Sequence, residues 1–301
     1  MVKSTITETE AIRVKEYETA MIIRRYKEEL SLDVNRFFSS QSISLYQCPD
    51  TRYKFFYPEQ LAGDGKFYET LQGFDWYYIP WKWEHQITAQ YIENVSSILE
   101  VGCGQGGFIE KINMKKEIME VVGLELNEDA VKKLSAKRLK VLNKKVQDFA
   151  LEQRNHFDLV CSFQVLEHIY DVKSFVQSMI ECLKPGGKLV IAVPDNKSFI
   201  QYDEGGILNF PPHHMGWWDV DSLTALGNFL NLKVEKFYHE PLQEYHIDWY
   251  LNLLGKKAFS SFAAFLWGYE KIIKPLLRQL IKMKIIRPRG HSILVIYQKV
   301  K

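Results

Sequence analysis

The chain is poor in cysteine and has no long hydrophobic run. Only four of its 301 residues are cysteines, and none of them stands in a C-x-x-C pair, which argues against a disulfide framework and indicates a reducing compartment. The longest apolar stretch, residues 259–269, contains serines and is far shorter than a membrane span. The N-terminal residues lack the apolar core of a secretory signal. These absences predict a cytoplasmic protein.

The chain also lacks a strong charge of either sign. Its 39 basic and 37 acidic residues give a formal net charge of +2. No module of clustered basic and aromatic side chains is visible, so a nucleic-acid partner is not expected. With 46% hydrophobic and 25% charged residues, the composition is that of an ordinary globular protein. The length suits one large domain or a catalytic domain with additions, and no feature predicts an oligomeric state.

The first part of the chain is helical and aromatic in character. Residues 5–38 carry apolar side chains at helical spacing and predict a helix. Its apolar face would hold Val14, Tyr17, Met21 and Tyr26. The stretch that follows is rich in aromatic residues and punctuated by proline and glycine, which favours short elements and loops. We therefore assign residues 1–81 to an N-terminal helical and aromatic-rich extension.

From residue 96 onward, short aliphatic runs alternate with amphipathic segments. The runs SSILEVG, MEVVGLEL, LKVLN, FDLVCSF and GKLVIAVP have the composition of strands, and LKVEKFYH and HSILVIYQKV supply two late strands. Aliphatic strands that alternate with helices predict a parallel sheet covered on both faces. We assign residues 82–240 to this α/β domain, 241–290 to a helical insertion, and 291–301 to the final strand.

The most informative segment is ILEVGCGQGG, residues 98–107, in which a strand leads into a glycine-rich turn before a helix. Glycines let the backbone approach a ligand closely, and the helix that follows offers unpaired N–H groups. The spacing Gly102-x-Gly104-x-x-Gly107 also fits a dinucleotide-binding turn, and Glu125 about twenty residues later would bind a ribose in either case. Glu100 separates the two hypotheses, because a carboxylate suits the ammonium of a methionine moiety and sits badly beside a pyrophosphate.

Several motifs in order resemble class I S-adenosylmethionine-dependent methyltransferases. ILEVGCGQGGF is similar to their first motif and VVGLEL to their second. FDLVCSFQVLEHI resembles the strand and loop that reach the methyl donor, and LKPGGKLVIAVP the turn and strand that follow. The resemblance implies a Rossmann-like, doubly wound, mostly parallel seven-stranded sheet with an antiparallel last strand. KFYETLQGFDWYYIPWKWEH and PPHHMGWW resemble a bacterial subgroup associated with glycan or polysaccharide biosynthesis. Members of that subgroup commonly start with a paired-cysteine knuckle, of which this chain retains only Cys48.

The resemblance also implies roles for individual residues around an S-adenosylmethionine cofactor. The methionine end would be held by Glu100, Gly102, Cys103, Gly104 and Gly106. Glu125 would bind the ribose, Leu126, Asp148 and Phe149 would frame the adenine, and Phe163 and Gln164 would lie beside the sulfonium and the amino group. A helix before the first strand would cover the methionine end, where Lys82 could meet the carboxylate.

The acceptor of the methyl group would be a small molecule, a glycan or a nucleotide-sugar, with a hydroxyl oxygen as the favoured target and carbon or nitrogen as variants. A hydroxyl must lose a proton, and histidine titrates near neutrality. His168 follows the fourth strand, and His213 and His214 lie in the loop FPPHHMGWW, whose two tryptophans could stack on a sugar. Each histidine could instead have a structural role. We assign no metal site, because no third ligand is apparent beside the pair.

The insertion contains a basic amphipathic helix at residues 251–286. Apolar residues from Tyr269 to Leu280 form one stripe, and Lys271, Lys274, Arg278 and Lys282 form another on the opposite face. We expect the apolar stripe to face the core and the basic stripe to face solvent. A weak contact with the inner membrane surface is the alternative.

Two other functions stay open. One is an NAD-dependent oxidoreductase on a Rossmann fold. The other is a non-catalytic, methyltransferase-like binding subunit, against which the intact Glu100, Glu125 and Asp148 argue.

Overall fold

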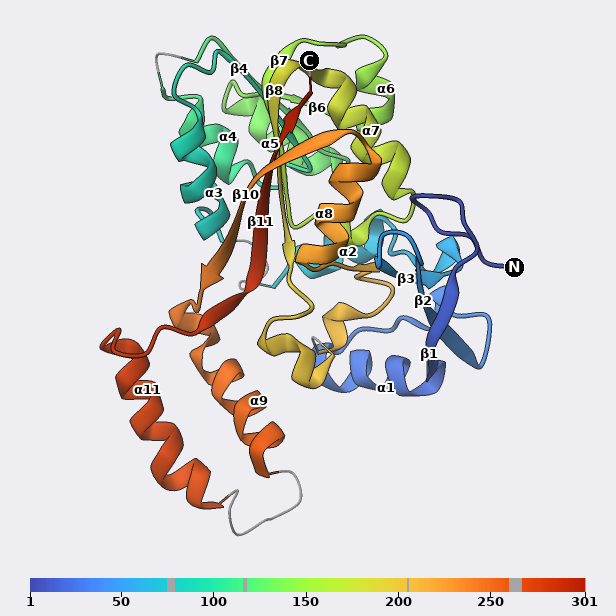
Figure 1. Cartoon of the computed structure of the whole chain (residues 1–301), viewed down its shortest axis with the longest axis vertical. Coiled ribbons are helices and arrows are strands. Elements are labelled where there is room, and N and C mark those ends of the chain that lie inside the picture. The colour runs from blue at the N-terminus through green and yellow to red at the C-terminus, as the bar shows by residue number, and fades with distance from the viewer. Residues whose placement is uncertain (75–78, 116–117, 205, 260–266, 301) are drawn as a thin grey trace.

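The computed structural model describes residues 1–74, 79–115, 118–204, 206–259 and 267–300. It contains a seven-stranded sheet and a four-stranded sheet (Figure 1). The large sheet has the order β10-β11-β8-β7-β4-β5-β6. Its strands, in chain order, are β4 Ser97–Val101, β5 Glu120–Leu124, β6 Lys140–Leu142, β7 Phe157–Phe163, β8 Leu183–Pro194, β10 Leu232–Pro241 and β11 Arg289–Lys299. β4, β5, β6, β7 and β8 pair in parallel, whereas β11 is antiparallel to both β8 and β10. The predicted fold is confirmed.

Helices cover both faces of this sheet, because its strands are apolar on both sides. Along β4, Ile98 packs on one face, and Leu99 and Val101 pack on the other. The Ile98 face is covered by α3 Trp83–Thr88, α4 Gly107–Ile112 and α5 Glu128–Ala136. The opposite face is covered by α6 Val146–Ala150, α7 Val172–Cys182 and α8 Val220–Phe229. The strands are aliphatic along almost their whole length because both of their faces are buried, as the sequence predicted.

The strand order reverses at β4, which has β5 on one side and β7 on the other. In open α/β sheets, ligands bind beyond the carboxyl ends of the strands at such a switch point. The glycine-rich turn follows β4, Glu125 follows β5, and Gln164 follows β7. The topology thus brings three segments that are distant in sequence to one edge of the sheet.

The N-terminal extension contains a strand where the sequence predicted a helix. β1 Ile12–Glu18 pairs with β2 Ser42–Gln47, and the helical parts of residues 5–38 are α1 Thr19–Leu30 and a short 3-10 turn, Asn35–Phe37. The helix prediction is therefore wrong for Ile12–Glu18, where Val14 is exposed. The small sheet continues through β3 Lys54–Tyr57 to β9 Gly216–Trp217. A strand of the α/β domain thus completes the sheet of the extension, and α2 Gly65–Gln72 packs beside it.

Within its described residues, the insertion contains α9 Ile247–Phe259 and α11 Lys274–Lys282, with a π-helical turn Tyr269–Ile273 leading into α11. Its predicted orientation holds only in part: Tyr269 is buried and Lys271 and Lys282 are exposed, as expected, but the other two basic side chains face α9. Lys274, expected in solvent, is only 15% exposed and bonds to Asn252 of α9, and Arg278 pairs with Asp248 of α9. Lys274 and Arg278 face α9 because α9 carries polar side chains on the side that contacts α11.

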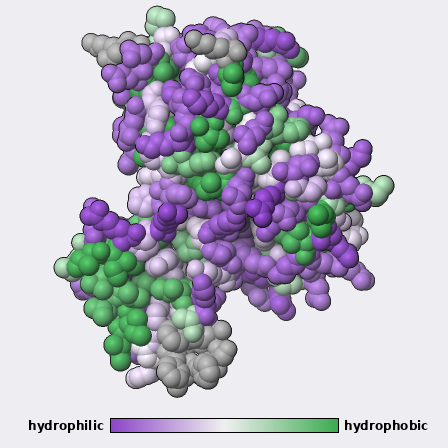
Figure 2. All heavy atoms as spheres, in the orientation of Figure 1, coloured by the Kyte–Doolittle hydropathy of each residue, from purple (hydrophilic) through white to green (hydrophobic). Residues whose placement is uncertain are grey.

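Part of the apolar stripe of α11 and its flanks therefore faces outward. Ile272 is 67% exposed and Leu276 is 58% exposed. Figure 2 shows hydrophobic surface gathered over this part of the molecule. We call this the outer face of α11, formed by Ile272, Ile273, Leu276 and Met283. Within the described residues, no helix combines the length and the apolar character needed to cross a membrane.

Candidate cofactor and acceptor site

The turn after β4 has a backbone that requires glycine. Gly102 has φ +76°, and a Cβ there would lie 2.5 Å from the Val165 side chain. Gly106 has φ +78°, and a Cβ would lie 2.5 Å from Leu134. Gly104 also has a positive φ of 52°. Cys103 contributes its backbone, since its carbonyl accepts from the N–H of Gly106 over 2.8 Å. The turn is therefore compact, with the neighbouring side chains packed against it.

Glu100 is a buried acid at the end of β4. Its residue is only 3% exposed, and Oε2 has no hydrogen-bond partner among the residues that the structure describes. Burial raises the pKa of this carboxyl well above its ordinary value, against a hydrogen bond from the N–H of Ile109 that lowers it. An unpaired buried oxygen is costly, so this position is poised for a donor from a ligand.

Glu125 organises the turn from the neighbouring strand. One carboxylate oxygen, Oε2, accepts from the N–H of Gly104 over 2.8 Å. The other, Oε1, accepts from the N–H groups of Leu126 and Asn127, each over 2.9 Å. Leu126 itself is 61% exposed. An acid held in place by three backbone donors and followed by an exposed apolar side chain is suited to bind a nucleoside.

The residues predicted to frame an adenine are divided by the structure. Asp148 is exposed in the first turn of α6. Phe149 is buried in the core, where its ring lies 6.0 Å from that of Phe157. Its ring thus anchors α6 to the sheet, because it has the apolar position of a short amphipathic helix. Leu126 and Asp148 are the members of the predicted set that face solvent.

The segment before α3 lies over the turn. A Cβ on Gly107 would lie 2.0 Å from the carbonyl oxygen of Pro80, so the backbone of this segment approaches the start of α4 closely. Lys82 is the N-cap residue of α3 and lies close to three buried acids, Glu84, Glu100 and Glu167. Burial raises the pKa values of these acids, that of Glu167 to about 8, and the positive charge of Lys82 opposes the rise. Lys82 therefore lies close to the acidic groups of the site.

Gln164 follows β7 in a left-handed conformation, with φ 55°. Its side-chain amide donates to Glu84 Oε1 over 3.4 Å and to Ser292 Oγ over 3.3 Å. Burial raises the pKa of Glu84. Phe163 is buried, and its ring packs against those of Phe108 and His85. Gln164 thus reaches the carboxyl edge of the sheet, whereas the Phe163 ring is part of the core beneath it.

The three predicted histidines meet. His168 ends the short turn Leu166–His168, and its ring centroid lies 4.6 Å from that of His213 and 5.0 Å from that of His214. All three rings are buried or nearly so, and burial lowers their pKa values, that of His168 to about 4. The premise that the pair lacks a third ligand is therefore wrong, because His168 completes a triad from a segment 45 residues away.

The loop that carries His213 is held by the N-terminal extension. Tyr26 Oη donates to the carbonyl of Phe210 over 2.9 Å, and Tyr68 Oη donates to that of His213 over 3.1 Å. The N–H of Gly63 donates to the carbonyl of Pro212 over 2.7 Å. The extension thus contacts three successive parts of the loop and fixes its path.

The two tryptophans of this loop do not form a stacking wall. Trp218 is fully buried and stacks on Tyr53 with ring centroids 4.1 Å apart. Trp217 is partly buried, and its Nε1–H donates to the carbonyl of Asn209 over 2.7 Å. The prediction of a sugar-stacking pair is wrong, because both rings pack the junction between β9 and the extension.

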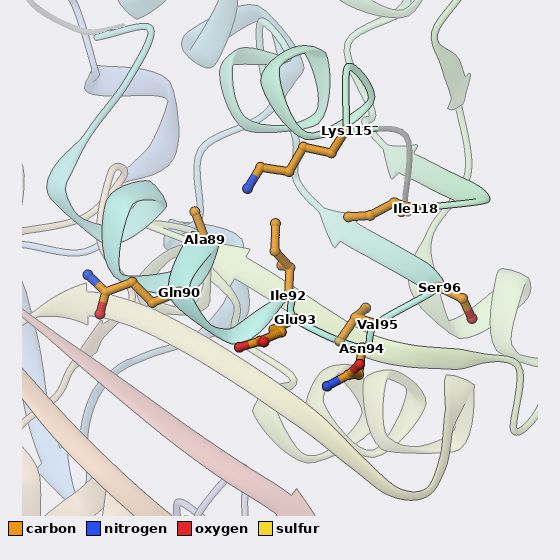
Figure 3. Close-up of a pocket in the computed structure, with 9 residues that line it drawn as sticks. All are labelled: Ala89, Gln90, Ile92, Glu93, Asn94, Val95, Ser96, Lys115 and Ile118. Atoms are coloured by element: carbon orange, nitrogen blue, oxygen red, sulfur yellow. The ribbon is translucent and has the colours of Figure 1, made fainter.

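A separate hollow of about 740 Å³ lies at the opposite edge of the large sheet (Figure 3). It is lined by residues such as Asn94 and Ser96, just before β4, and Ile118, just before β5. This is the amino end of the strands, away from the glycine turn, so the hollow is not the predicted site.

Sequence reasoning missed the buried acids Glu84 and Glu167 and the amide Asn209. Glu167 is part of the quoted LEHI motif, so its neighbour His168 gave a signal. Glu84 and Asn209 stand in segments whose position over the site depends on tertiary contacts, and nothing in their local pattern marks them.

Comparisons with known proteins agree with this geometry. A family described as a methyltransferase domain matches residues 77–236, just over half of the chain. An S-adenosylmethionine-dependent methyltransferase described from Mycobacterium tuberculosis is 25% identical over 169 residues, which cover 54% of this chain and 60% of that protein. A ubiquinone biosynthesis O-methyltransferase of Nitrosospira multiformis is 35% identical over 96 residues, 30% of this chain and 39% of that protein.

Among solved structures, a methyltransferase of Haloferax volcanii, crystallised with the Trm112 activator, aligns over 73% of this chain and 90% of its own. It is 15% identical, with a TM-score of 0.50. This likeness concerns the fold. Because the family model matches more than half of the chain, the chain belongs to the methyltransferase-domain family.

Proposed function

We propose that the chain transfers the methyl group of S-adenosylmethionine to an oxygen of a small molecule or glycan, such as a sugar nucleotide. The observation that carries this proposal is the buried Glu100 carboxylate, whose Oε2 has no partner among the described residues. A methionine ammonium above the glycine turn would donate to that oxygen and bring the opposite charge. A dinucleotide would place phosphate oxygens there instead, next to a buried acid, which argues against an oxidoreductase.

The other cofactor contacts follow from the same edge of the sheet. Glu125 would accept from one ribose hydroxyl, since an ionised carboxylate has about four acceptor sites and backbone donors use three of them. Leu126 would cover one face of the adenine, and Asp148 would accept from its amino group. Lys82 would meet the methionine carboxylate. These contacts would orient the sulfonium so that its methyl group points toward Gln164 and the histidine triad.

Methyl transfer from a sulfonium is an in-line displacement, which the protein assists by aligning the acceptor and excluding water. The acceptor would lie between Gln164 and the histidine triad. Oxygen as the target is supported by relatives named as ubiquinone biosynthesis O-methyltransferases. A glycan acceptor is supported by the PPHH loop and the aromatic segment that resemble the polysaccharide-associated subgroup. Because Trp217 and Trp218 do not form a stacking wall, the polar groups of that loop would recognise the glycan.

We also propose that the outer face of α11 rests on an anionic lipid surface, which would suit a lipid-linked acceptor. Lys271 and Lys282 are exposed on the same helical segment as the apolar side chains. Apolar groups beside cations match a membrane interface, where they meet acyl chains and anionic headgroups.

Titration calorimetry and turnover assays test the function. We expect micromolar affinity for S-adenosylhomocysteine and none for NADH, whereas the reverse result removes the proposal. Labelled S-adenosylmethionine, offered with a panel of sugar nucleotides, lipid-linked glycans and phenolic small molecules, then identifies the acceptor. Cofactor binding without transfer to any acceptor class in the panel would favour a non-catalytic binding subunit.

A further inference from the structure

We propose that His168, His213 and His214 form a binding site for a divalent transition-metal cation. Each residue offers one ring nitrogen, and the three atoms all lie within 4.8 Å of one another. The ligands come from two segments, the turn after β7 and the loop before β9. Three imidazoles are the ligand set of a catalytic zinc site with an open fourth position. Tetrahedral bonds of about 2.0–2.1 Å place such nitrogens about 3.4 Å apart, so the rings would close in around a bound ion.

The hydrogen bonds of the triad fix the tautomers that such a site needs. His168 Nδ1 lies 2.6 Å from the carbonyl oxygen of His213, and His213 Nδ1 lies 2.9 Å from that of Leu208. A carbonyl can only accept, so each of these Nδ1 atoms carries the proton. In the neutral rings, Nε2 is then the nitrogen with a lone pair. Metal-binding histidines characteristically donate their other N–H to a carbonyl or carboxylate in this way.

The third ring is oriented by Asn209. His214 Nδ1 lies 3.0 Å from Asn209 Oδ1. The Asn209 amide nitrogen donates to the carbonyl of Glu204 and to Asn196 Oδ1, each over 2.7 Å. Because the Glu204 carbonyl can only accept, the amide nitrogen must face it, and the amide oxygen must face His214. All three rings thus have the same protonation pattern, with an acceptor at Nδ1.

A buried acid beside the triad points independently to a cation. Glu167 is only 2% exposed, its Oε1 lies 4.0 Å from His168 Nε2, and its Oε2 has no hydrogen-bond partner within the described part of the chain. A metal ion at the triad would supply the positive charge that this carboxylate lacks. Three imidazoles and one carboxylate suit zinc, iron, nickel or copper better than magnesium or calcium.

A second cluster, Glu240, His246 and His291, has a similar composition. Its carboxylate is already used, because Glu240 Oε2 accepts from the backbone N–H groups of His291 and Ser292, each over 3.2 Å. His291 Nδ1 also lies 3.2 Å from that oxygen. This cluster therefore satisfies its acid internally and provides a matched control.

The role of the cation rests on the proposed methyl transfer. A hydroxyl bound to the open position would become more acidic, and its proton would pass to water. The oxygen would then form a bond to the methyl carbon as the carbon–sulfur bond breaks, with the electron pair going to sulfur to give S-adenosylhomocysteine.

Metal titration of the full-length protein tests the site. Chelator-treated protein is titrated with cobalt(II), followed by its visible absorption, and with zinc(II) in competition with a chromogenic chelator. We expect one ion per chain in the wild type. His168→Gln and His214→Gln are expected to weaken binding by more than about 100-fold, beyond the effect of losing an outer hydrogen bond. His246→Gln is expected to bind as the wild type does.

Thermal unfolding and S-adenosylhomocysteine affinity are measured on the same samples, so that a misfolded variant is recognised. Glu167→Gln, which keeps the side chain's shape, serves where a histidine variant fails to fold, and we expect it to bind zinc about 10-fold or more weakly. The proposal is overturned if folded wild-type protein binds neither metal, or if His246→Gln alone removes binding. Neither result would contradict the proposed function, because the affinity for S-adenosylhomocysteine is measured separately and tests that function.

Discussion

Replacing Glu100 with glutamine removes one charge and keeps the shape of the side chain. In the free protein the acid is buried, with Oε2 unpartnered among the described residues. A hydrogen bond to a charged group contributes about 1.5–3 kcal/mol. Losing it should weaken S-adenosylhomocysteine binding by roughly 10- to 150-fold, since about 1.4 kcal/mol corresponds to a factor of ten.

The assay compares two ligands that differ at the group Glu100 is proposed to meet. S-adenosylhomocysteine has the amino-acid end, and 5′-methylthioadenosine lacks it but has the same nucleoside. Calorimetry should show a large loss for the first ligand and almost none for the second. Glu128→Gln, at an exposed acid on α5, is the matched control and should change neither. An equal loss for both ligands, or no loss, would refute the assignment of Glu100 to the ammonium.

The same variant should be more stable without ligand. Burial raises the pKa of Glu100 in the folded protein, so the folded state binds this proton more tightly than the unfolded state does. Ionisation of Glu100 therefore lowers the free energy of unfolding. This loss is absent below the unfolded-state pKa of about 4.3, and it grows as the pH rises toward the pKa of the folded state. Glutamine does not ionise, so at pH 7 the Tm should rise by roughly 2–4 °C for each kcal/mol recovered. At pH 4 the two proteins should unfold at similar temperatures.

Three further predictions concern the ribose contact, the junction with the extension, and the insertion. Glu125→Ala should weaken S-adenosylhomocysteine binding by about 1–3 kcal/mol in calorimetry, because it removes the carboxylate that we propose accepts from the ribose and leaves the N–H of Gly104 in the turn without its acceptor; unchanged affinity would show that the ribose lies elsewhere. Trp218→Ala should lower the free energy of unfolding by about 3–5 kcal/mol in denaturant titrations, since the ring is fully buried against Tyr53. A loss under about 1 kcal/mol would contradict that packing. The double variant Ile272→Ser and Leu276→Ser should reduce co-sedimentation with vesicles containing phosphatidylserine, and equal sedimentation of wild type and variant would reject the lipid surface.

The meeting of the proposed cofactor residues at one edge of the sheet could be predicted from the sequence because its signals are local. The glycine turn, Glu100 and Glu125 each stand at the end of an apolar run, and parallel strands bring such ends together whatever the details of packing. Phe149 shows the limit of this reasoning. Its position next to Asp148 fits an adenine contact. However, the five-residue helix α6 must bury apolar side chains against the sheet, and the Phe149 ring is one of those that it buries.

The acceptor half could not be predicted, because it depends on contacts between distant segments. His168 and His213 lie 45 residues apart, and nothing in either segment shows that they meet. The residues around Val14 have helical spacing, yet they pair with β2 as a strand, since pairing across a sheet overrides a weak periodic pattern. The orientation of α11 was likewise decided by its polar partners on α9.

The loop that carries His213 accepts hydrogen bonds from Tyr26, Gly63 and Tyr68, which all belong to the N-terminal extension. The stretch that matches the methyltransferase-domain family, residues 77–236, includes the loop itself but none of the three donors that hold it. Substitutions at these donors would therefore shift the histidine loop without changing the sequence of the matched stretch. The extension is thus a place where the loop can be altered while the glycine turn and Glu125 are left unchanged.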